Sequence, residues 1–196
     1  MSIRTARAPS RVSRDDRIER DRAELAELLA AVRHGLRTTG HPAAAAEMVA
    51  QCLSEHRPGV GLLKLDEQAG DAEHYQQHIL HVDRDTGFSV VALVWRAGQR
   101  TAIHDHLCWG AVAVLSGSEL ESRYTAVPGP SGLRLIETEQ RINPTGDISH
   151  FTPPGDIHYV CNPGPGTAIS LHVYGADIAA QRSSIRRTYA PEQISV

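Results

Sequence analysis

The sequence has few cysteines and few aromatic residues, and each scarcity excludes a class of protein. Its 196 residues include three cysteines with no Cys-x-x-Cys pair, which excludes a disulfide framework or a zinc ribbon and favours a reducing, cytoplasmic compartment. Aromatic residues make up 5%, and the formal net charge is -3, unlike the basic balance of a dedicated nucleic-acid-binding protein. No apolar run approaches the roughly 20 residues of a membrane helix, so we expect neither a membrane span nor a nucleic-acid partner.

Histidine is the exception to this scarcity. The chain has 11 histidines, so the side chains available for metal binding or acid–base chemistry are mostly imidazoles. The 41% of hydrophobic and 22% of charged residues are typical of a globular protein. The length suffices for one well-filled core.

Three regions of the chain differ in their pattern. Residues 1–14 are rich in Arg, Ser and Ala without periodicity, which predicts a disordered tail. Residues 15–57 carry apolar side chains at helical spacing, and Pro42 suits the first turn of a second helix, so we expect a helical cap. Residues 58–196 switch to strand-like alternation broken by Gly and Pro turns, which predicts a mainly β jelly-roll barrel that forms one structural domain with the cap. The candidate strands are residues 60–66, 75–82, 88–96, 101–106, 109–116, 119–127, 133–140, 147–152, 157–162 and 167–174.

The sharpest local pattern is a pair of histidines two residues apart. His104 and His106 lie on a predicted strand, so both imidazoles point to one face, where neutral ring nitrogens could share a cation, while Asp105 points away. A second pattern, at residues 153–162, combines a tight turn with a strand that carries His158 near its start. A third imidazole is therefore expected at the same pocket.

A third pattern alternates polar and apolar residues. Ser170, His172 and Tyr174 share one face of a predicted strand, whereas Leu171 and Val173 would pack on the other face. A hydroxyl, an imidazole and a phenol can form a hydrogen-bonded relay that holds the phenol against a metal-bound ligand. Strands that expose such residues to water are also common, so the pattern is weak without the metal motifs.

The two histidine patterns resemble the two motifs of the cupin superfamily. Four residues fit each motif, with one extra residue after Gly146: Gly98, His104, His106 and Gly117 in the first, and Pro153, Gly155, His158 and Asn162 in the second. The resemblance implies a double-stranded β-helix barrel. Gly110 stands where the first motif usually has a glutamate ligand, so it implies a metal site of three histidines without a carboxylate.

The combination is similar to the thiol dioxygenases, which include cysteine dioxygenase and 3-mercaptopropionate dioxygenase. That resemblance implies Fe(II) held by His104, His106 and His158, beside a relay of Ser170, His172 and Tyr174. It also implies that a small thiol carboxylate, 3-mercaptopropionate or cysteine, is converted with O2 into its sulfinate. The ligands alone would equally suit manganese, nickel or cobalt.

Two positions depart from animal cysteine dioxygenase. Gly110 replaces the cysteine that is crosslinked to the relay tyrosine, and Cys108 lies nearer the turn, so we expect no crosslink. Gln77 stands where the carboxylate-binding arginine would be, as in the bacterial 3-mercaptopropionate type. In that type an arginine shortly after the relay tyrosine holds the carboxylate, and Arg182 is the candidate here, since a guanidinium matches a carboxylate in bidentate geometry.

Two other functions stay open at this stage. A different three-histidine cupin dioxygenase could cleave a carbon–carbon bond in a non-thiol substrate, although it would give no reason for the relay. A cupin that only senses a small molecule is the alternative outside enzymes. Residues 15–57 show no basic recognition helix that would favour a DNA-binding sensor.

Overall fold

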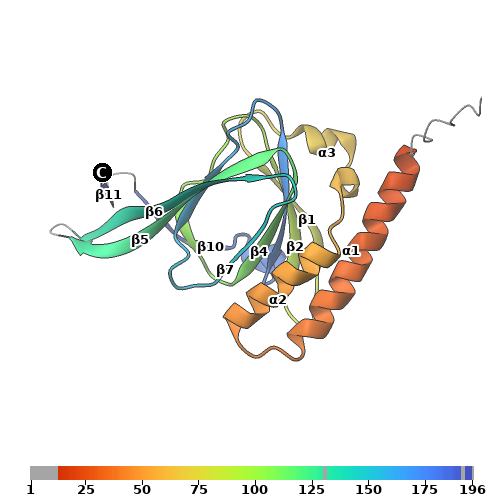
Figure 1. Ribbon diagram of the computed structural model, residues 1–196, viewed down its shortest axis with the longest axis horizontal. Coiled ribbons are helices and arrows are strands. Elements are labelled where there is room, and N and C mark those ends of the chain that lie inside the picture. The colour runs from red at the N-terminus through yellow and green to blue at the C-terminus, as the bar shows by residue number, and fades with distance from the viewer. Residues whose placement is uncertain (1–12, 130–131, 191–192, 196) are drawn as a thin grey trace, which may run out of the picture.

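The computed structural model describes residues 13–129, 132–190 and 193–195, and shows a β-barrel with helices packed along one side (Figure 1). The helices are α1 (Arg14–Leu36), α2 (Pro42–Glu55), the 3-10 turn η1 (Val60–Leu62), α3 (Leu65–Ala69) and α4 (Ile178–Gln181). The strands are β1 (Gln76–Val82), β2 (Ser89–Trp95), β3 (Ile103–His106), β4 (Gly110–Ser116), β5 (Ser118–Gly129), β6 (Gly132–Pro144), β7 (Ile148–Phe151), β8 (His158–Cys161), β9 (Ala168–Tyr174), β10 (Ile185–Tyr189) and β11 (Ile194–Ser195). Among the described residues, no helix is both long and apolar enough to cross a membrane.

The predicted pair of N-terminal helices is present as α1 and α2. Ser13 caps α1, because its hydroxyl accepts a hydrogen bond from the Asp16 amide at 3.0 Å while the Asp16 carboxylate accepts one from the Ser13 amide. Helix α2 starts at Pro42, as predicted. The predicted tail of residues 1–14 is two residues too long, since Ser13 and Arg14 begin α1; residues 1–12 lie outside the described part of the chain.

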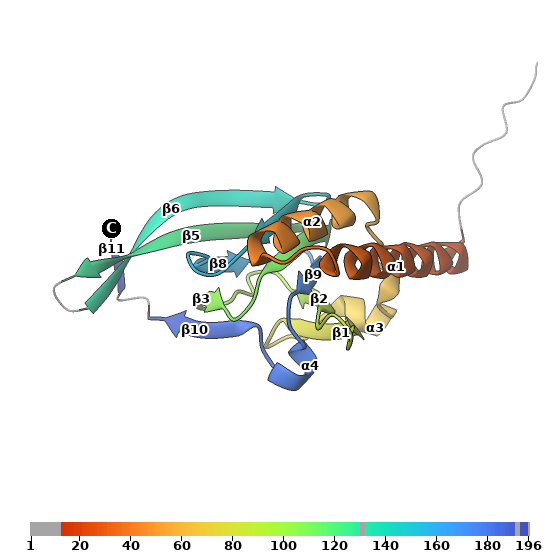
Figure 2. The ribbon, with the colours of Figure 1, turned by 90° about the horizontal axis from the view of Figure 1, so that it is seen from below.

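The strands form two sheets, which confirms the mainly β prediction. One sheet has the order β1-β2-β9-β4-β7 and the other β10-β3-β8-β5-β6-β11, with antiparallel pairing except between β11 and β6. Strands β5 and β6 form a long ribbon that runs past the barrel, with β11 near its far end (Figure 2). Gly117 closes the turn from β4 to β5 with φ +75°, a conformation that glycine adopts without strain.

Alternation along β2 and β9 separates two cores. One set of side chains packs against α1 and α2: Leu28, Val32, Val49, Leu53, Val90, Ala92, Val94, Leu171 and Val173. The other set faces the interior of the barrel: Val91, Leu93, Trp95, Val112, Phe151, Val160 and Tyr174. Leu171 and Val173 therefore pack on the face opposite Ser170, His172 and Tyr174, as the sequence predicts.

The predicted strand at residues 60–66 is wrong. This segment forms η1 and the start of α3. The Asp21 carboxylate of α1 accepts a hydrogen bond from the Gly61 amide, with an N–O distance of 2.8 Å. The Gln68 side chain donates to the carbonyl oxygens of Val60 and Leu63, which fixes the turn. Contacts from other segments thus override the apolar alternation of Val60 to Leu63.

Candidate metal centre

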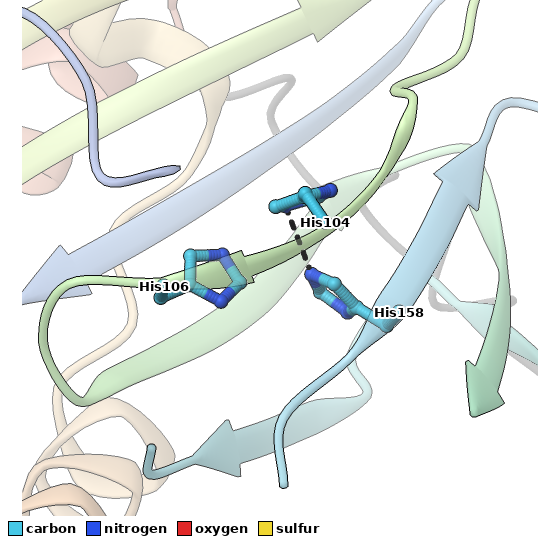
Figure 3. A group of neighbouring side chains, drawn as sticks. All are labelled: His104, His106 and His158. Carbon is cyan, nitrogen blue, oxygen red and sulfur yellow. Dashed lines mark hydrogen bonds between the residues drawn. The ribbon is translucent and has the colours of Figure 1, made fainter. Parts of the chain in front are cut away.

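The barrel brings the three predicted histidines together. His104 and His106 extend from β3, and His158 extends from β8, where it is the register partner of His104 (Figure 3). Each is buried, and one ring nitrogen from each lies within 4.8 Å of the others. Asp105 points to the opposite face of β3, where Arg186, Arg187 and Tyr189 of β10 bind its carboxylate.

Each imidazole is held by a hydrogen bond at Nδ1. The three acceptors are the Ala102 carbonyl oxygen for His104 at 2.9 Å, the Asp156 carboxylate for His106 at 2.9 Å, and the Glu121 carboxylate for His158 at 2.8 Å. Carbonyl and carboxylate oxygens only accept, so Nδ1 carries the proton in all three rings. Each Nε2 therefore has a free lone pair, as a metal ligand requires.

The nitrogen lone pairs crowd one another. Nε2 of His104 lies 3.2 Å from Nε2 of His158, and two lone pairs at this distance repel each other unless a proton or cation lies between them. Burial, with the neighbouring imidazoles, lowers the pKa of His104 to about 3. A proton is thus disfavoured there near neutral pH, and the three-nitrogen donor set fits a divalent transition-metal ion.

The two carboxylates that accept these hydrogen bonds, Glu121 and Asp156, stay ionised. Burial alone would raise the pKa of Glu121, but the hydrogen bond from His158 and the nearby Arg123 guanidinium lower it to about 2. Burial likewise opposes ionisation of Asp156, but the hydrogen bonds from the His106 side chain and from backbone amides together outweigh it and lower the pKa. Two carboxylates therefore surround a neutral ligand set and raise its basicity toward a cation.

The space beside Gly110 is filled by an aromatic ring. Gly110 has no side chain, and a Cβ there would overlap the ring of Phe151. That ring stacks on His106 with centroids 4.1 Å apart and an interplanar angle of 25°. Among the described residues no carboxylate joins the three histidines as a ligand. Phe151 thus closes this side of the site with apolar surface.

The polar face of β9 forms a buried chain of hydrogen bonds. Ser170 Oγ lies 2.9 Å from His172 Nε2, and Tyr174 Oη lies 3.1 Å from His172 Nδ1. The Trp95 indole donates to Ser170 Oγ at 3.3 Å. Burial, with the neighbouring imidazoles of His106 and His158, lowers the pKa of His172 to about 3, and burial raises the pKa of Tyr174. Both side chains are therefore neutral at neutral pH.

The histidines and the relay share one cavity. Its walls include His104, His106, His158, His172 and Tyr174, and its volume is about 30 Å³. A single water molecule needs about 10–15 Å³ on this scale, so the space suits only a small ligand. Such a cavity is too small for a bulky phenolic substrate without movement of its walls.

The two predicted carboxylate-binding residues lie in different places. Gln77 of β1 is exposed and lines the mouth of the metal cavity together with Tyr75. Arg182 does not line that cavity, because it lies past the end of α4, where its φ is +66°. It lines a neighbouring depression of about 750 Å³ that Gln77 and Tyr75 also line, so the two residues face one connected surface.

Sequence reasoning missed several residues of the site. Glu121 and Asp156 orient two of the histidines, and Phe151 fills the space beside Gly110. Asp156 lies two residues before His158 in the second motif, and Glu121 alternates with Glu119 on a predicted strand, so both carried a signal. No pattern in the sequence indicated that Phe151 lies against Gly110, because this contact depends on the pairing of β4 with β7.

Comparisons with known proteins agree with this architecture only at the level of the fold. No family model matches the chain. Similar solved structures include a cupin superfamily protein from Desulfitobacterium hafniense, with 10% identity, a TM-score of 0.42 and coverage of 55% of this chain and 83% of that one. A double-stranded β-helix protein from Klebsiella pneumoniae has 23% identity and a TM-score of 0.40, with coverage of 57% and 86%.

A recombinant oxalate oxidase in complex with glycolate is also similar, with 17% identity, a TM-score of 0.43 and coverage of 55% of this chain and 54% of that one. With TM-scores below 0.5, these likenesses identify no closer relationship. The two facing sheets form the mainly β barrel that the resemblance of the histidine motifs to the cupins implies.

Proposed function

We propose that this cupin is an iron-dependent thiol dioxygenase that converts a small thiol carboxylate into its sulfinate with O2. The observation that carries the proposal is the common cavity of the three histidines and the relay, in which Tyr174 faces the same space as His104, His106 and His158. The two alternatives, a dioxygenase that cleaves a carbon–carbon bond and a sensor of a small molecule, give no role to a tyrosine hydroxyl held in this way.

His104, His106 and His158 would hold the ferrous ion through their Nε2 atoms. A ferrous ion bound there would lower the pKa of the substrate thiol and supply the redox chemistry by which O2 oxidises the sulfur. Neutral ligands suit this role, because they leave the positive charge of the ion available to an anionic substrate.

The relay would hold a proton at a fixed place beside the substrate. His172 is neutral and bonded on both nitrogens, so it fixes the position of the Tyr174 hydroxyl. Because burial keeps the phenol protonated, Tyr174 can hydrogen-bond the substrate or donate a proton to it. Phe151 and Val160 line the same cavity and exclude water from it.

The carboxylate end of the substrate would lie at the mouth of the cavity. Gln77, which lines this mouth, would donate a hydrogen bond to the carboxylate, and Arg182 would supply positive charge from the adjoining depression. Arg100, which the sequence reasoning did not consider, lines the same depression and adds a second guanidinium. A negatively charged end group is therefore favoured over a neutral or positive one.

The test is anaerobic reconstitution with ferrous iron, followed by measurement of O2 uptake and sulfinate with 3-mercaptopropionate, cysteine and cysteamine. We expect uptake with a thiol carboxylate that is lost in His158→Ala and kept in His150→Ala, because His150 is exposed on β7, away from the cavity. Absence of thiol-dependent uptake with all three compounds would remove the proposal. Tight thiol binding without turnover would favour a sensor instead.

Arg182→Gln separates recognition of the carboxylate from chemistry. We expect it to raise KM for 3-mercaptopropionate about tenfold with little change in kcat, and to leave cysteamine, which has no carboxylate, unaffected. An equal effect on both thiols would exclude a carboxylate-binding role for Arg182.

A further inference from the structure

A second carboxyl group lies inside the barrel beside the relay. Glu119 is 4% exposed and alternates on β5 with Glu121, so both side chains point inward. Glu121 is bonded to His158, whereas Oε1 of Glu119 has no hydrogen-bond partner among the described residues. A buried polar atom of this kind requires an explanation, and the proposed function gives it none.

Glu119 faces the inner end of the hydrogen-bonded chain. Burial raises its pKa to about 7, while the nearby Ser170 hydroxyl and Trp95 indole stabilise its anion. Glu119 in turn contributes to the raised pKa of Tyr174. The titratable groups that act on it are Glu121 on its own strand and Tyr174 on β9. His172 of β9 lies one hydrogen bond beyond Ser170, and Trp95 of β2 is neutral. Glu119 can thus carry or lose a proton near neutral pH.

The hydrogen bonds of the chain can run in only two directions. A neutral His172 has one N–H group, and Ser170 Oγ already accepts a hydrogen bond from Trp95. If His172 donates from Nε2 to Ser170, then Ser170 must donate inward, and Tyr174 donates to Nδ1. If Ser170 donates to His172, then Nδ1 donates to Tyr174, and the Tyr174 proton points into the cavity.

We propose that Glu119 is the inner end of this chain and that its protonation sets the direction of the hydrogen bonds. An ionised Glu119 accepts from Ser170, so Tyr174 donates to His172 and offers only an acceptor to the cavity. A protonated Glu119 donates to Ser170, so Tyr174 becomes a donor to the cavity. Glu119 is therefore a positioning residue, which acts on the substrate through the relay.

The change of direction moves one proton along the chain. Tyr174 takes a proton from the cavity and gives its own to His172 Nδ1. His172 gives its Nε2 proton to Ser170 Oγ, and Ser170 gives its proton to the Glu119 carboxylate. Each member except Glu119 ends with as many protons as it began with, so no imidazolium is formed, as the low pKa of His172 requires. In the proposed function, on which this step rests, the proton comes from the substrate thiol.

The tautomer of His172 reports the direction without turnover. We would record nitrogen NMR spectra of the metal-free protein labelled at histidine, and assign His172 with a His172→Gln variant. The proton should sit on Nδ1 below pH 7 and on Nε2 above it. In Glu119→Gln, whose amide has no proton to gain or lose in this range, the tautomer of His172 should no longer change with pH. Glu139→Gln, an exposed change on β6, should behave as the wild type.

A tautomer that stays the same across this pH range in the wild type overturns the proposal. That outcome is expected if a protonated Glu119 donates to another acceptor, such as Asn143, its register partner on β6, whose Oδ1 is also unpartnered among the described residues. The wild-type titration decides the question even if Glu119→Gln does not fold.

The kinetic arm uses the iron-loaded enzyme. Glu119→Gln should lower kcat at least tenfold with KM nearly unchanged, because the thiol proton has no acceptor at the inner end. It should also abolish the pH dependence of kcat near pH 7. Equal kcat and an unchanged pH profile would overturn the proton-accepting role. If no thiol is oxidised but the tautomer switches, the proposed function fails and the role of Glu119 in the chain stands.

Discussion

The Glu121 carboxylate and the His158 imidazole are joined by a 2.8 Å hydrogen bond between β5 and β8. It places the proton of His158 on Nδ1 and directs Nε2 into the cavity. The pairing of β5 with β8 brings the two side chains together, so the geometry of the metal site depends on a strand that supplies no ligand.

Glu121→Gln should weaken metal binding without abolishing it. The amide oxygen can still accept from His158, but the negative charge that raises the basicity of the imidazole is lost. We expect the affinity for ferrous iron to fall about 10- to 100-fold, measured anaerobically by competition with a chelator. Glu139→Gln is the control, and equal affinities of the two variants would show that the Glu121 charge does not act on the metal.

Tyr174→Phe should separate the relay from the metal site. Removal of the hydroxyl leaves the three histidines intact, so the iron content should match that of the wild type, while kcat for thiol-dependent O2 uptake falls about 100-fold. Tyr124→Phe is the matched control, because Tyr124 lies outside the cavity and its hydroxyl contacts Glu137. Full activity in Tyr174→Phe would leave the relay without a catalytic role.

The metal-free protein should lose stability as the pH falls from 6.5 toward 4.5. His172 has a pKa of about 3 when folded and 6.5 ordinarily, so in this range only the unfolded chain binds its proton. The contribution of the neutral His172 to the free energy of unfolding is fully present above pH 6.5. Below pH 6.5 it is lost by about 1 kcal/mol for each unit by which the pH falls. His104 acts in the same direction. Glu119, whose folded pKa is raised to about 7, opposes both by binding its proton first in the folded state.

Urea unfolding at several pH values measures this balance. His172→Gln should flatten the dependence by about 1 kcal/mol per pH unit, and Glu119→Gln should steepen it by a similar amount. A parallel slope in His172→Gln would mean that His172 takes its proton as readily in the folded protein as in the unfolded chain.

Gly110→Ala should destabilise the barrel. The added methyl group would overlap the Phe151 ring, which cannot withdraw without losing its stacking on His106. We expect the free energy of unfolding to fall by about 1–3 kcal/mol in chemical denaturation. Gly40→Ala is the control, because a Cβ there meets no atom within 4 Å. If the two variants are equally stable, the Phe151 ring can move aside at little cost in free energy. A larger side chain could then be accommodated at residue 110.

The histidine spacing made the centre of the site predictable, whereas its surroundings depend on strand pairing. Two residues that are two apart on a strand must share a face, so the directions of His104 and His106 follow from local geometry. The same rule places Ser170, His172 and Tyr174 in one line.

Other features depend on partners far away in the chain. The turn at η1 is stabilised by the hydrogen bond from the Gly61 amide to Asp21 of α1. No pattern in the neighbouring sequence predicts this contact. Strand β10 was missed for a similar reason. Its Arg186 and Arg187 do not alternate with apolar residues, and the strand is defined by its pairing with β3.

The binding of Asp105 by Arg186, Arg187 and Tyr189 of β10 has a consequence for the order in which the site is completed. The strand β3, which supplies two of the three histidines, has β8 on one side and β10 on the other. All three histidines precede β10 in the chain. The ribosome therefore synthesises them before Arg186 and Tyr189, the residues of β10 that bind Asp105. The three histidines are thus synthesised before the strand that pairs with β3, and we expect high-affinity metal binding only after β10 has paired.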